Sequence, residues 1–481
     1  MEHNWSIQRQ TKGLFYGFGA VVVLSIFAFV LTQEYLMLAV PAVLLLFYFT
    51  LSDFRKIFFL LLCFLPLSTE VTLPNGFSTD LPSEPLIVGL MGVFFLYVLR
   101  YPTAVAAAFF RHPITLLLLL HLGWMLVATV QSSELFVSVK FFLAKIWYVV
   151  TFYFLAGLLL KEEKDVRQAF WIIFIPLIFT ILIVLARHAQ YGFSFEMVYK
   201  VLSPFYRNHV TYAAIMAIMV PWVWFARYWY PAWSTRWWVL LGGLLLLLVA
   251  VQLSYTRAAY LAIFVAAGAY VMIRLRLTKL TLAGAAVVAF IGLTYLGTDE
   301  RYLELAPNYE RTITHTDFGN LIEATYQLED ISTMERVYRW VAAFQMIGDK
   351  PWFGFGPGNF YNFYKGYTVT SFRTYVSDNP EQSGVHSYYL MTLVDQGIPG
   401  LIIFLLFLFG ALIYGENIYH RTKDVMNRRI VMIALLMIVV ISLLQLINDL
   451  IETDKVGPFF FISLALLVNV DLQNRRRASI N

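Results

Sequence analysis

The stretch "HSYYLMTLVDQGIPGLIIFLLFLFGALIY", residues 386–414, decides the fold class. It begins with polar side chains and continues into an apolar run long enough to cross about 30 Å of hydrocarbon as a helix. Lipid offers the peptide backbone no hydrogen bonds, so a run of this kind inside a bilayer must be helical. The stretch therefore predicts a membrane helix with one histidine, His386, at its mouth.

Similar apolar runs recur along the whole chain. Of its 481 residues, 60% are hydrophobic and only 14% are charged, which is more apolar surface than one soluble domain can bury. The single cysteine, Cys63, lies in an apolar run, so no disulfide framework is expected. The composition predicts an all-α polytopic membrane protein with 12–14 transmembrane helices. The apolar segments are 13–31, 35–51, 57–68, 85–99, 114–130, 136–160, 168–187, 209–226, 237–254, 257–273, 280–297, 387–414, 430–450 and 456–470.

Basic residues alternate between successive connectors. One set of connectors contains 21 of the 35 lysines and arginines, so the positive-inside rule places that set and both termini in the cytoplasm. The segment 298–386 then lies outside, and it has seven Lys or Arg against twelve Asp or Glu. We therefore expect N-terminal membrane helices over 1–297 and an extracytoplasmic loop domain over 298–386. C-terminal membrane helices and a short basic tail follow over 387–481.

The outer loop is long enough to fold as a small domain. The segment "DKPWFGFGPGNF", residues 349–360, has proline and glycine at turn-forming spacing. A glycine-rich run can bind nucleotide phosphates, but no strand precedes this one, so we interpret it as a tight turn. Before it, apolar residues at helical spacing predict one or two amphipathic helices between 320 and 349. They are Leu321, Leu328, Ile331, Met334, Val337, Val341 and Phe344.

Three arginines and one histidine are the first candidate site residues. Arg207 ends an outer connector, Arg257 begins a span, and Arg336 and His386 lie in the outer loop. The planar fork of arginine matches phosphate oxygens, and histidine can accept a proton near neutral pH. The alternatives are lipid-headgroup anchoring for Arg207 and Arg257, and helix capping for His386.

Arg339 and Lys145 are two further candidates for substrate contact. Lys145 falls within the apolar segment 136–160, where a charge usually faces a water-filled cavity or a charged partner. The alternative for Lys145 is that its side chain snorkels toward the interface. No group of His, Cys, Asp and Glu has metal-ligand spacing, so we expect neither a metal nor a cofactor. The acidic partner of His386 stays open among Asp378, Glu381, Asp449, Glu452 and Asp454.

The reaction that fits these residue types is displacement at a sugar carbon. Arginines would stabilise a departing lipid diphosphate, and His386 would act as the general base that takes the proton from an attacking hydroxyl. A direct displacement of this kind inverts the anomeric carbon.

Three motifs resemble the outer-face signature of bacterial O-antigen ligases. In the first, His386, Ser387, Gly397 and Gly400 match the pattern His, Asn/Ser/Gln, nine residues, Gly, two residues, Gly/Thr/Tyr. The segment "RAAYL", 257–261, matches Arg-x-x-x-Leu. The segment 335–360 resembles R-x-x-x-W…P-x-x-G-x-G-x-x-x-F, through Arg336, Trp340, Pro351, Gly354 and Gly356. The resemblance extends from about residue 205 to 470.

This resemblance implies an activity and partners. Such ligases transfer a finished O-antigen polysaccharide from undecaprenyl diphosphate to the lipid A–core oligosaccharide, at the periplasmic face of the bacterial inner membrane. The partners would be these two lipids and the surrounding membrane lipids, with no nucleic acid, ATP or metal. Two relatives share the pattern, the O-antigen polymerase and the protein O-oligosaccharyltransferases. A lipid-linked sugar flippase or exporter is a remoter alternative, because it needs neither the histidine nor the roofing loop.

Overall fold

The computed structural model describes residues 2–33, 52–72, 78–298, 331–372, 377–379 and 382–480, with isolated positions between 37 and 48. Most of the apolar segment 35–51, the first part of the outer loop and Glu381 lie outside the described residues. Within the described residues the chain is almost entirely helical, as the composition predicts. One short antiparallel hairpin, β1 (Thr69–Thr72) with β2 (Ser78–Leu81), pairs Thr69 with Leu81 and Thr72 with Ser78.

The helices of the N-terminal half are α1 (Glu2–Thr32), α3 (Phe54–Phe64), α4 (Ser83–Arg100), α5 (Ala107–Phe110), α6 (Pro113–Val130), α7 (Leu135–Val149), the π-helix η1 (Val150–Leu155), α8 (Ala156–Leu159), α9 (Glu163–Ala189), η2 (Phe195–Met197), α10 (Val198–Leu202), α11 (His209–Ala226) and η3 (Arg227–Trp229). Those that follow are α12 (Thr235–Leu253), α13 (Arg257–Arg274), α14 (Thr278–Gly297), α16 (Ile331–Asp349), α17 (Phe360–Phe363), η5 (Tyr364–Tyr367), η6 (Thr370–Phe372), α18 (Tyr388–Arg421), α19 (Val425–Leu444) and α20 (Gly457–Ile480).

Ten helices among the described residues are long and apolar enough to cross a bilayer. They are α4, α6, α9, α11, α12, α13, α14, α18, α19 and the continuous run Leu135–Leu159 formed by α7, η1 and α8. The predicted segment 57–68 is only the 11-residue helix α3. The predicted segment 456–470 lies in α20, which is almost completely buried among its neighbours as far as Asp471. The chain is therefore a multi-pass membrane protein built around α11, α19 and α20.

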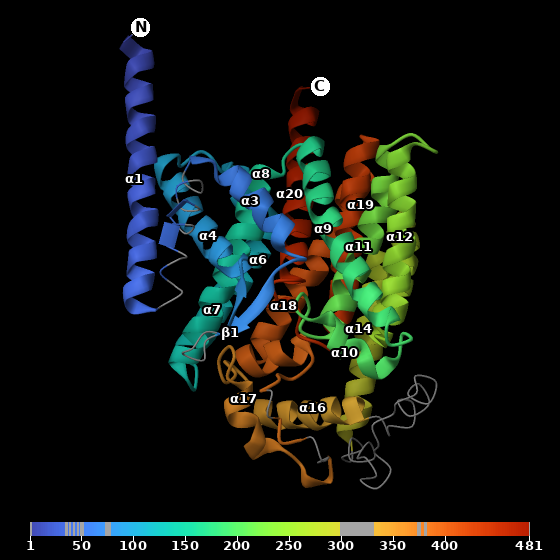
Figure 1. The fold of residues 1–481 in the computed structure, drawn as a ribbon. Helices are drawn as coiled ribbons and strands as arrows, with labels where there is room; N and C mark the ends of the chain where they lie inside the picture. Colours follow the sequence, from blue (N-terminus) through green and yellow to red (C-terminus); the bar gives the residue numbers. More distant parts are fainter. Residues whose placement is uncertain are drawn as a thin grey trace.

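A separate layer covers one end of this helical body. Figure 1 shows α16 lying across the end opposite to both termini. Met334, Val337 and Val341, on one face of α16, are buried, as their helical spacing predicts, whereas Phe344 remains 44% exposed. These buried residues form an apolar cluster distinct from that of the helical body.

The turn that follows α16 packs against a break in α18. Gly397 interrupts α18 with φ 72° and ψ −176°, and the Ile398 amide donates to the Pro351 carbonyl at 2.8 Å. Gly354 has φ 67°, and a Cβ there would lie 2.3 Å from the Val394 carbonyl oxygen. Only glycine fits this contact, because it has no Cβ and tolerates positive φ. The glycine-rich segment is therefore a structural turn.

The arrangement makes the orientation of the chain testable. Asn362, in α17 at the α16 end (Figure 1), and Lys423, in the connector that follows the far end of α18, are both exposed. In a Cys63→Ser background, we expect a cysteine at position 362 to react with a membrane-impermeant thiol reagent in intact spheroplasts. A cysteine at position 423 should react only after lysis, because basic connectors stay in the cytoplasm. Labelling of position 423 from outside would reverse the orientation.

Candidate active site

His386 lies in the loop that leads into α18. Its backbone has φ 58°, and the next residue, Ser387, provides the N-cap of α18 with a side-chain oxygen that accepts from the Leu390 amide. The Tyr388 amide donates to the carbonyls of Gln445 (2.9 Å) and Asn448 (3.0 Å) in the connector between α19 and α20. Because Ser387 makes the cap, the His386 side chain is not needed for that role.

Two arginines of α16 act on this histidine. Arg336 and Arg339 are three residues apart, which places them on neighbouring parts of one helix face. The Arg336 Nε donates to the Ile447 carbonyl at 3.3 Å, and Arg339 donates to the Gly384 carbonyl at 3.2 Å. These contacts join α16 to the loop before α18 and to the α19–α20 connector. Three separate segments of the chain thus converge on His386.

The surroundings of His386 favour its neutral form. Burial, together with the positive charges of Arg336 and Arg339, lowers the pKa of His386 to about 3. Both causes disfavour the imidazolium ion, since one removes water and the other adds like charge. At neutral pH the ring is therefore uncharged and has a nitrogen lone pair available to accept a proton.

A second histidine, His209, lies close to two of the candidate arginines, although it is not among the residues predicted from sequence. His209 begins α11, and both Arg336 and Arg257 are close enough to act on its ring electrostatically. Its Nδ1 is buried and has no hydrogen-bond partner among the described residues. Arg257 is the first residue of α13, next to Thr256, whose hydroxyl donates to the His209 carbonyl at 3.3 Å. The cluster therefore extends from Arg257 to His386. His209 is the first residue of the predicted apolar segment 209–226, and no motif in the sequence singles it out.

Arg207 takes a different position from the other arginines. Its side chain is 71% exposed and forms an ion pair with Glu70 of β1 at 3.6 Å. The charges that act on His386 and His209 are those of Arg257, Arg336 and Arg339. Arg207 thus lies outside the group of arginines that act on the histidines, and its ion pair connects the β hairpin to the start of α11.

Lys145 is buried and paired. Its side chain is 3% exposed and forms an ion pair with Glu452. The same ammonium donates to the Tyr388 hydroxyl at 2.9 Å, and that hydroxyl also contacts Glu452 at 3.1 Å. The three side chains link α7, the α19–α20 connector and the first residue of α18. Lys145 therefore positions the helix that follows His386.

The structure distinguishes the acidic residues that sequence left open. Glu452 is engaged by Lys145, and Asp454 accepts from Ser68 at 2.5 Å and from Ser83 at 3.3 Å. Asp449 is the one beside the His386 loop, because a Cβ at Gly384 would lie 2.6 Å from its Oδ2. Burial and the nearby Glu452 raise the pKa of Asp449, although Arg339 and Arg336 oppose that shift. Asp378 is exposed, and Glu381 lies outside the described residues.

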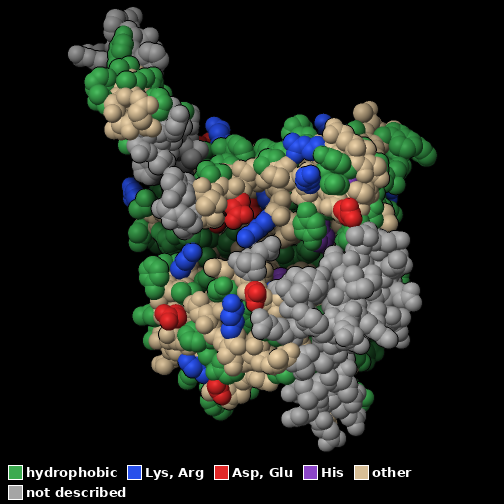
Figure 2. All heavy atoms as spheres, turned by 60° about the horizontal axis from the view of Figure 1, so that its bottom comes forward, with side chains coloured by type: hydrophobic (Ala, Val, Ile, Leu, Met, Phe, Trp, Pro, Cys, Tyr) green, Lys and Arg blue, Asp and Glu red, His purple; other side chains and the backbone are tan. Residues whose placement is uncertain are grey.

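Seen from the α16 end, the surface has a hollow with histidine side chains inside it and lysine and arginine side chains around it (Figure 2). The described residues contain no group of three or more His, Cys, Asp or Glu able to hold a metal ion. A positively charged site with a neutral histidine can bind phosphate oxygens and accept one proton.

Comparison with known proteins bears on the same region. Residues 242–405 match the family model described as O-antigen ligase, which is about a third of the chain. The matched region contains Arg257, Arg336, Arg339 and His386, whereas Lys145 and Arg207 precede it. A search of curated proteins finds no match. Residues 242–405 of this chain are thus similar to the O-antigen ligase family.

Proposed function

We propose that this protein transfers O-antigen polysaccharide from undecaprenyl diphosphate to the lipid A–core oligosaccharide, at the periplasmic face of the bacterial inner membrane. The observation that carries the proposal is a neutral, half-buried His386 close enough to Arg336 and Arg339 to feel their positive charges. This placement falls inside the region that matches the ligase family. The family match supports an enzyme of the ligase and polymerase type, and the choice of ligase is our proposal.

The arginines would bind the diphosphate of the donor. Arg257, Arg336 and Arg339 bring three positive charges to the cluster, and guanidinium groups stay charged at every relevant pH. Arg339 is paired with Glu335 at 3.5 Å, whose carboxylate offsets part of this charge. As the bond between the anomeric carbon and the phosphate oxygen breaks, negative charge grows on the diphosphate. Fixed positive charges lower the energy of that transition state more than that of the ground state.

His386 would supply the base. A hydroxyl of the core oligosaccharide attacks the anomeric carbon from the side opposite the diphosphate, and its proton moves to the imidazole. The new glycosidic bond forms while the old one breaks, so the configuration inverts. A carboxylate at Asp449, beside the same loop, would stabilise the imidazolium ion that forms.

The first prediction separates catalysis by His386 from a structural role. We expect His386→Ala and His386→Asn to lose roughly 10²–10⁴-fold in transfer rate, because neither side chain accepts a proton at neutral pH. Both should still bind the lipid diphosphate, since the arginines remain. The rate is measured with purified protein, lipid-linked glycan and lipid A–core acceptor.

The same assay distinguishes the ligase from its relatives. Transfer to lipid A–core supports ligation, whereas elongation of the lipid-linked glycan indicates a polymerase and modification of a Ser/Thr peptide indicates a protein transferase. Ser387→Ala, which removes the α18 cap, serves as the structural control. Near wild-type transfer by His386→Asn would exclude the general-base role.

The second prediction compares two arginines that the structure separates. Arg257→Ala should reduce donor binding and transfer sharply, because it removes a charge from the buried cluster. Arg257→Lys should restore only part of the activity, since an ammonium cannot make a two-pronged phosphate contact. Arg207→Ala should have a much smaller effect, because its side chain is exposed and its partner is Glu70. Equal losses in the two alanine variants would contradict this division.

The third prediction concerns pH. Since the pKa of His386 is lowered to about 3, the acidic fall in kcat/KM, which reports the free enzyme, should begin well below pH 6.5. The fall in kcat should occur at higher pH, because the bound diphosphate neutralises the arginines and raises the histidine pKa. Arg339→Gln should shift the acidic fall in kcat/KM to higher pH, because it removes a positive charge that lowers the His386 pKa. If kcat/KM instead falls near pH 6.5 and Arg339→Gln leaves that pH unchanged, the group that titrates is not His386.

A further inference from the structure

We propose that the end of the molecule opposite α16 binds the phosphate headgroup of an anionic phospholipid. The site is a cavity of about 210 Å³ lined by three arginines, two tyrosines and apolar side chains. Arg274 is the last residue of α13, and Arg428 and Arg429 lie in the first turn and a half of α19. All three therefore lie where membrane helices end, at the depth of lipid headgroups.

None of these arginines is in an ion pair within the described part of the chain. Arg274 lies over the ring of Tyr270 and donates to its hydroxyl at 3.1 Å. Arg428 lies over Tyr419, and Arg429 donates to the Tyr228 carbonyl at 2.8 Å. Stacking on aromatic rings and single hydrogen bonds leave most of the fifteen or so guanidinium N–H donors open. Three positive charges in one cavity repel one another, so an anion there would relieve that repulsion.

Carboxylates near the cavity are already engaged elsewhere. Asp424 caps α19 by accepting from the Asn427 amide at 2.8 Å. Glu416 accepts from the amide and the hydroxyl of Thr278, at 3.1 and 2.5 Å. Both carboxylates hydrogen-bond at helix ends, and among the described residues neither forms an ion pair with Arg274, Arg428 or Arg429.

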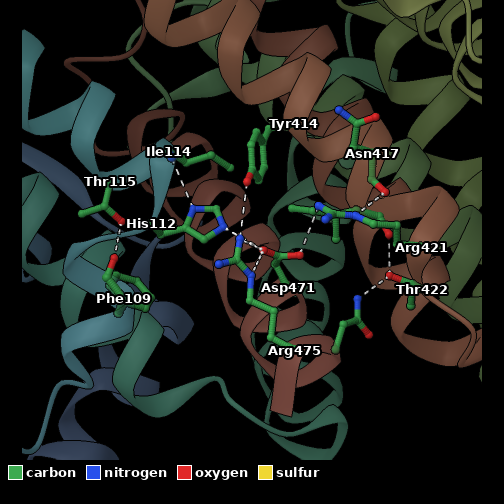
Figure 3. A network of polar contacts seen from close by, with 12 residues as sticks. Phe109, His112, Ile114, Thr115, Tyr414, Asn417, Arg421, Thr422, Asp471 and Arg475 are labelled. Carbon is green, nitrogen blue, oxygen red and sulfur yellow. Dashed lines mark hydrogen bonds and ion pairs between the residues drawn. The ribbon is translucent and has the colours of Figure 1, made fainter. Parts of the chain in front are cut away.

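Two other arginines at this end, Arg421 and Arg475, do form ion pairs with a carboxylate. In Figure 3, Arg421 and Arg475 both reach Asp471, at 3.5 and 2.7 Å, and His112 approaches the same carboxylate at 3.3 Å. Asp471 is 2% exposed and serves two arginines. The basic residues here therefore divide into a set that neutralises a buried carboxylate and a set that faces an open cavity.

The other walls of the cavity favour a lipid over a soluble anion. Phe225 and Met432 are buried in the lining, and Val425 is 50% exposed beside them. Trp224 and Tyr228, next to the cavity, are 44% and 45% exposed, as is common for aromatic side chains at the membrane interface. Basic pockets between membrane helices, with apolar surface directly below, suit a phosphate attached to acyl chains.

Native mass spectrometry of the purified full-length protein tests this proposal. Phosphatidylglycerol and phosphatidylethanolamine with the same acyl chains are titrated separately, and the dissociation constant of the first bound lipid is compared. We expect phosphatidylglycerol to bind more tightly. Arg274→Gln/Arg428→Gln/Arg429→Gln should weaken it by about a hundredfold, since each arginine at the membrane surface contributes about a factor of five.

A matched control variant also removes three positive charges from the end of the molecule opposite α16. Lys279→Gln/Lys423→Gln/Arg477→Gln changes three exposed basic residues outside the cavity and should leave binding within about twofold of wild type. Equal weakening by both triple variants would mean diffuse attraction and would overturn the site. Val425→Glu places a carboxylate beside the arginines at an exposed position, so it should also weaken binding even if the first variant fails to fold.

Soluble phosphate is tested as a competitor. Inorganic phosphate and glycerol 3-phosphate, each at the lipid concentration, should not displace phosphatidylglycerol, because the apolar walls add to lipid affinity alone. Displacement by either would assign the cavity to a soluble phosphate compound. Unchanged lipid binding in Val425→Glu together with a folded arginine triple variant would also overturn the proposal.

Discussion

The break in α18 is the constraint on which the rest of the structure depends. A helix interrupted inside a membrane protein leaves amide and carbonyl groups that lipid cannot satisfy. Here the turn after α16 supplies the partners, because the Phe355 and Gly356 amides donate to the carbonyls of Val394 and Asp395 at 2.8 and 3.0 Å. The Trp124 indole donates to a further carbonyl at the break, that of Gln396, at 2.9 Å.

This docking also locates the candidate active site. Since α16 ends at Asp349, immediately before the turn, anchoring the turn holds α16 across the mouth of α18. Arg336 and Arg339 are thereby held near His386, which lies two residues before α18. Gly354 of the outer-loop motif and Gly397 of the histidine motif thus lie in the same contact, between the turn and the break in α18. Their role is to position charged side chains that lie more than ten residues away from them.

Charge is distributed differently at the two ends of the molecule. At the α16 end, arginines surround a neutral histidine, and the buried lysine nearby is compensated by Glu452. At the opposite end, Asp471 compensates Arg421 and Arg475, while the arginines of the α13–α19 cavity have no such carboxylate among the described residues. Uncompensated positive charge at a membrane surface suits a phosphate ligand. At the α16 end, by contrast, Arg339 is paired with Glu335 at 3.5 Å.

The sequence by itself determined the membrane class, the amphipathic helix α16, the turn after it, and the choice of His386, Arg257 and Arg336. These features follow from hydropathy, periodicity and motif spacing, which are local properties of the chain. Burial within the bundle was decided only by tertiary structure. The spans His209–Trp229 and Thr278–Tyr295 have the same mean hydropathy of 1.5, yet 72% of one and 6% of the other are buried. Tertiary structure alone also decided which charged side chains meet. More than a hundred residues separate the partners in each of three pairs, Lys145 with Glu452, Arg207 with Glu70, and His209 with Arg336. Apolar helices carry no local signal for which ends will meet, because lipid and protein interior favour the same side chains.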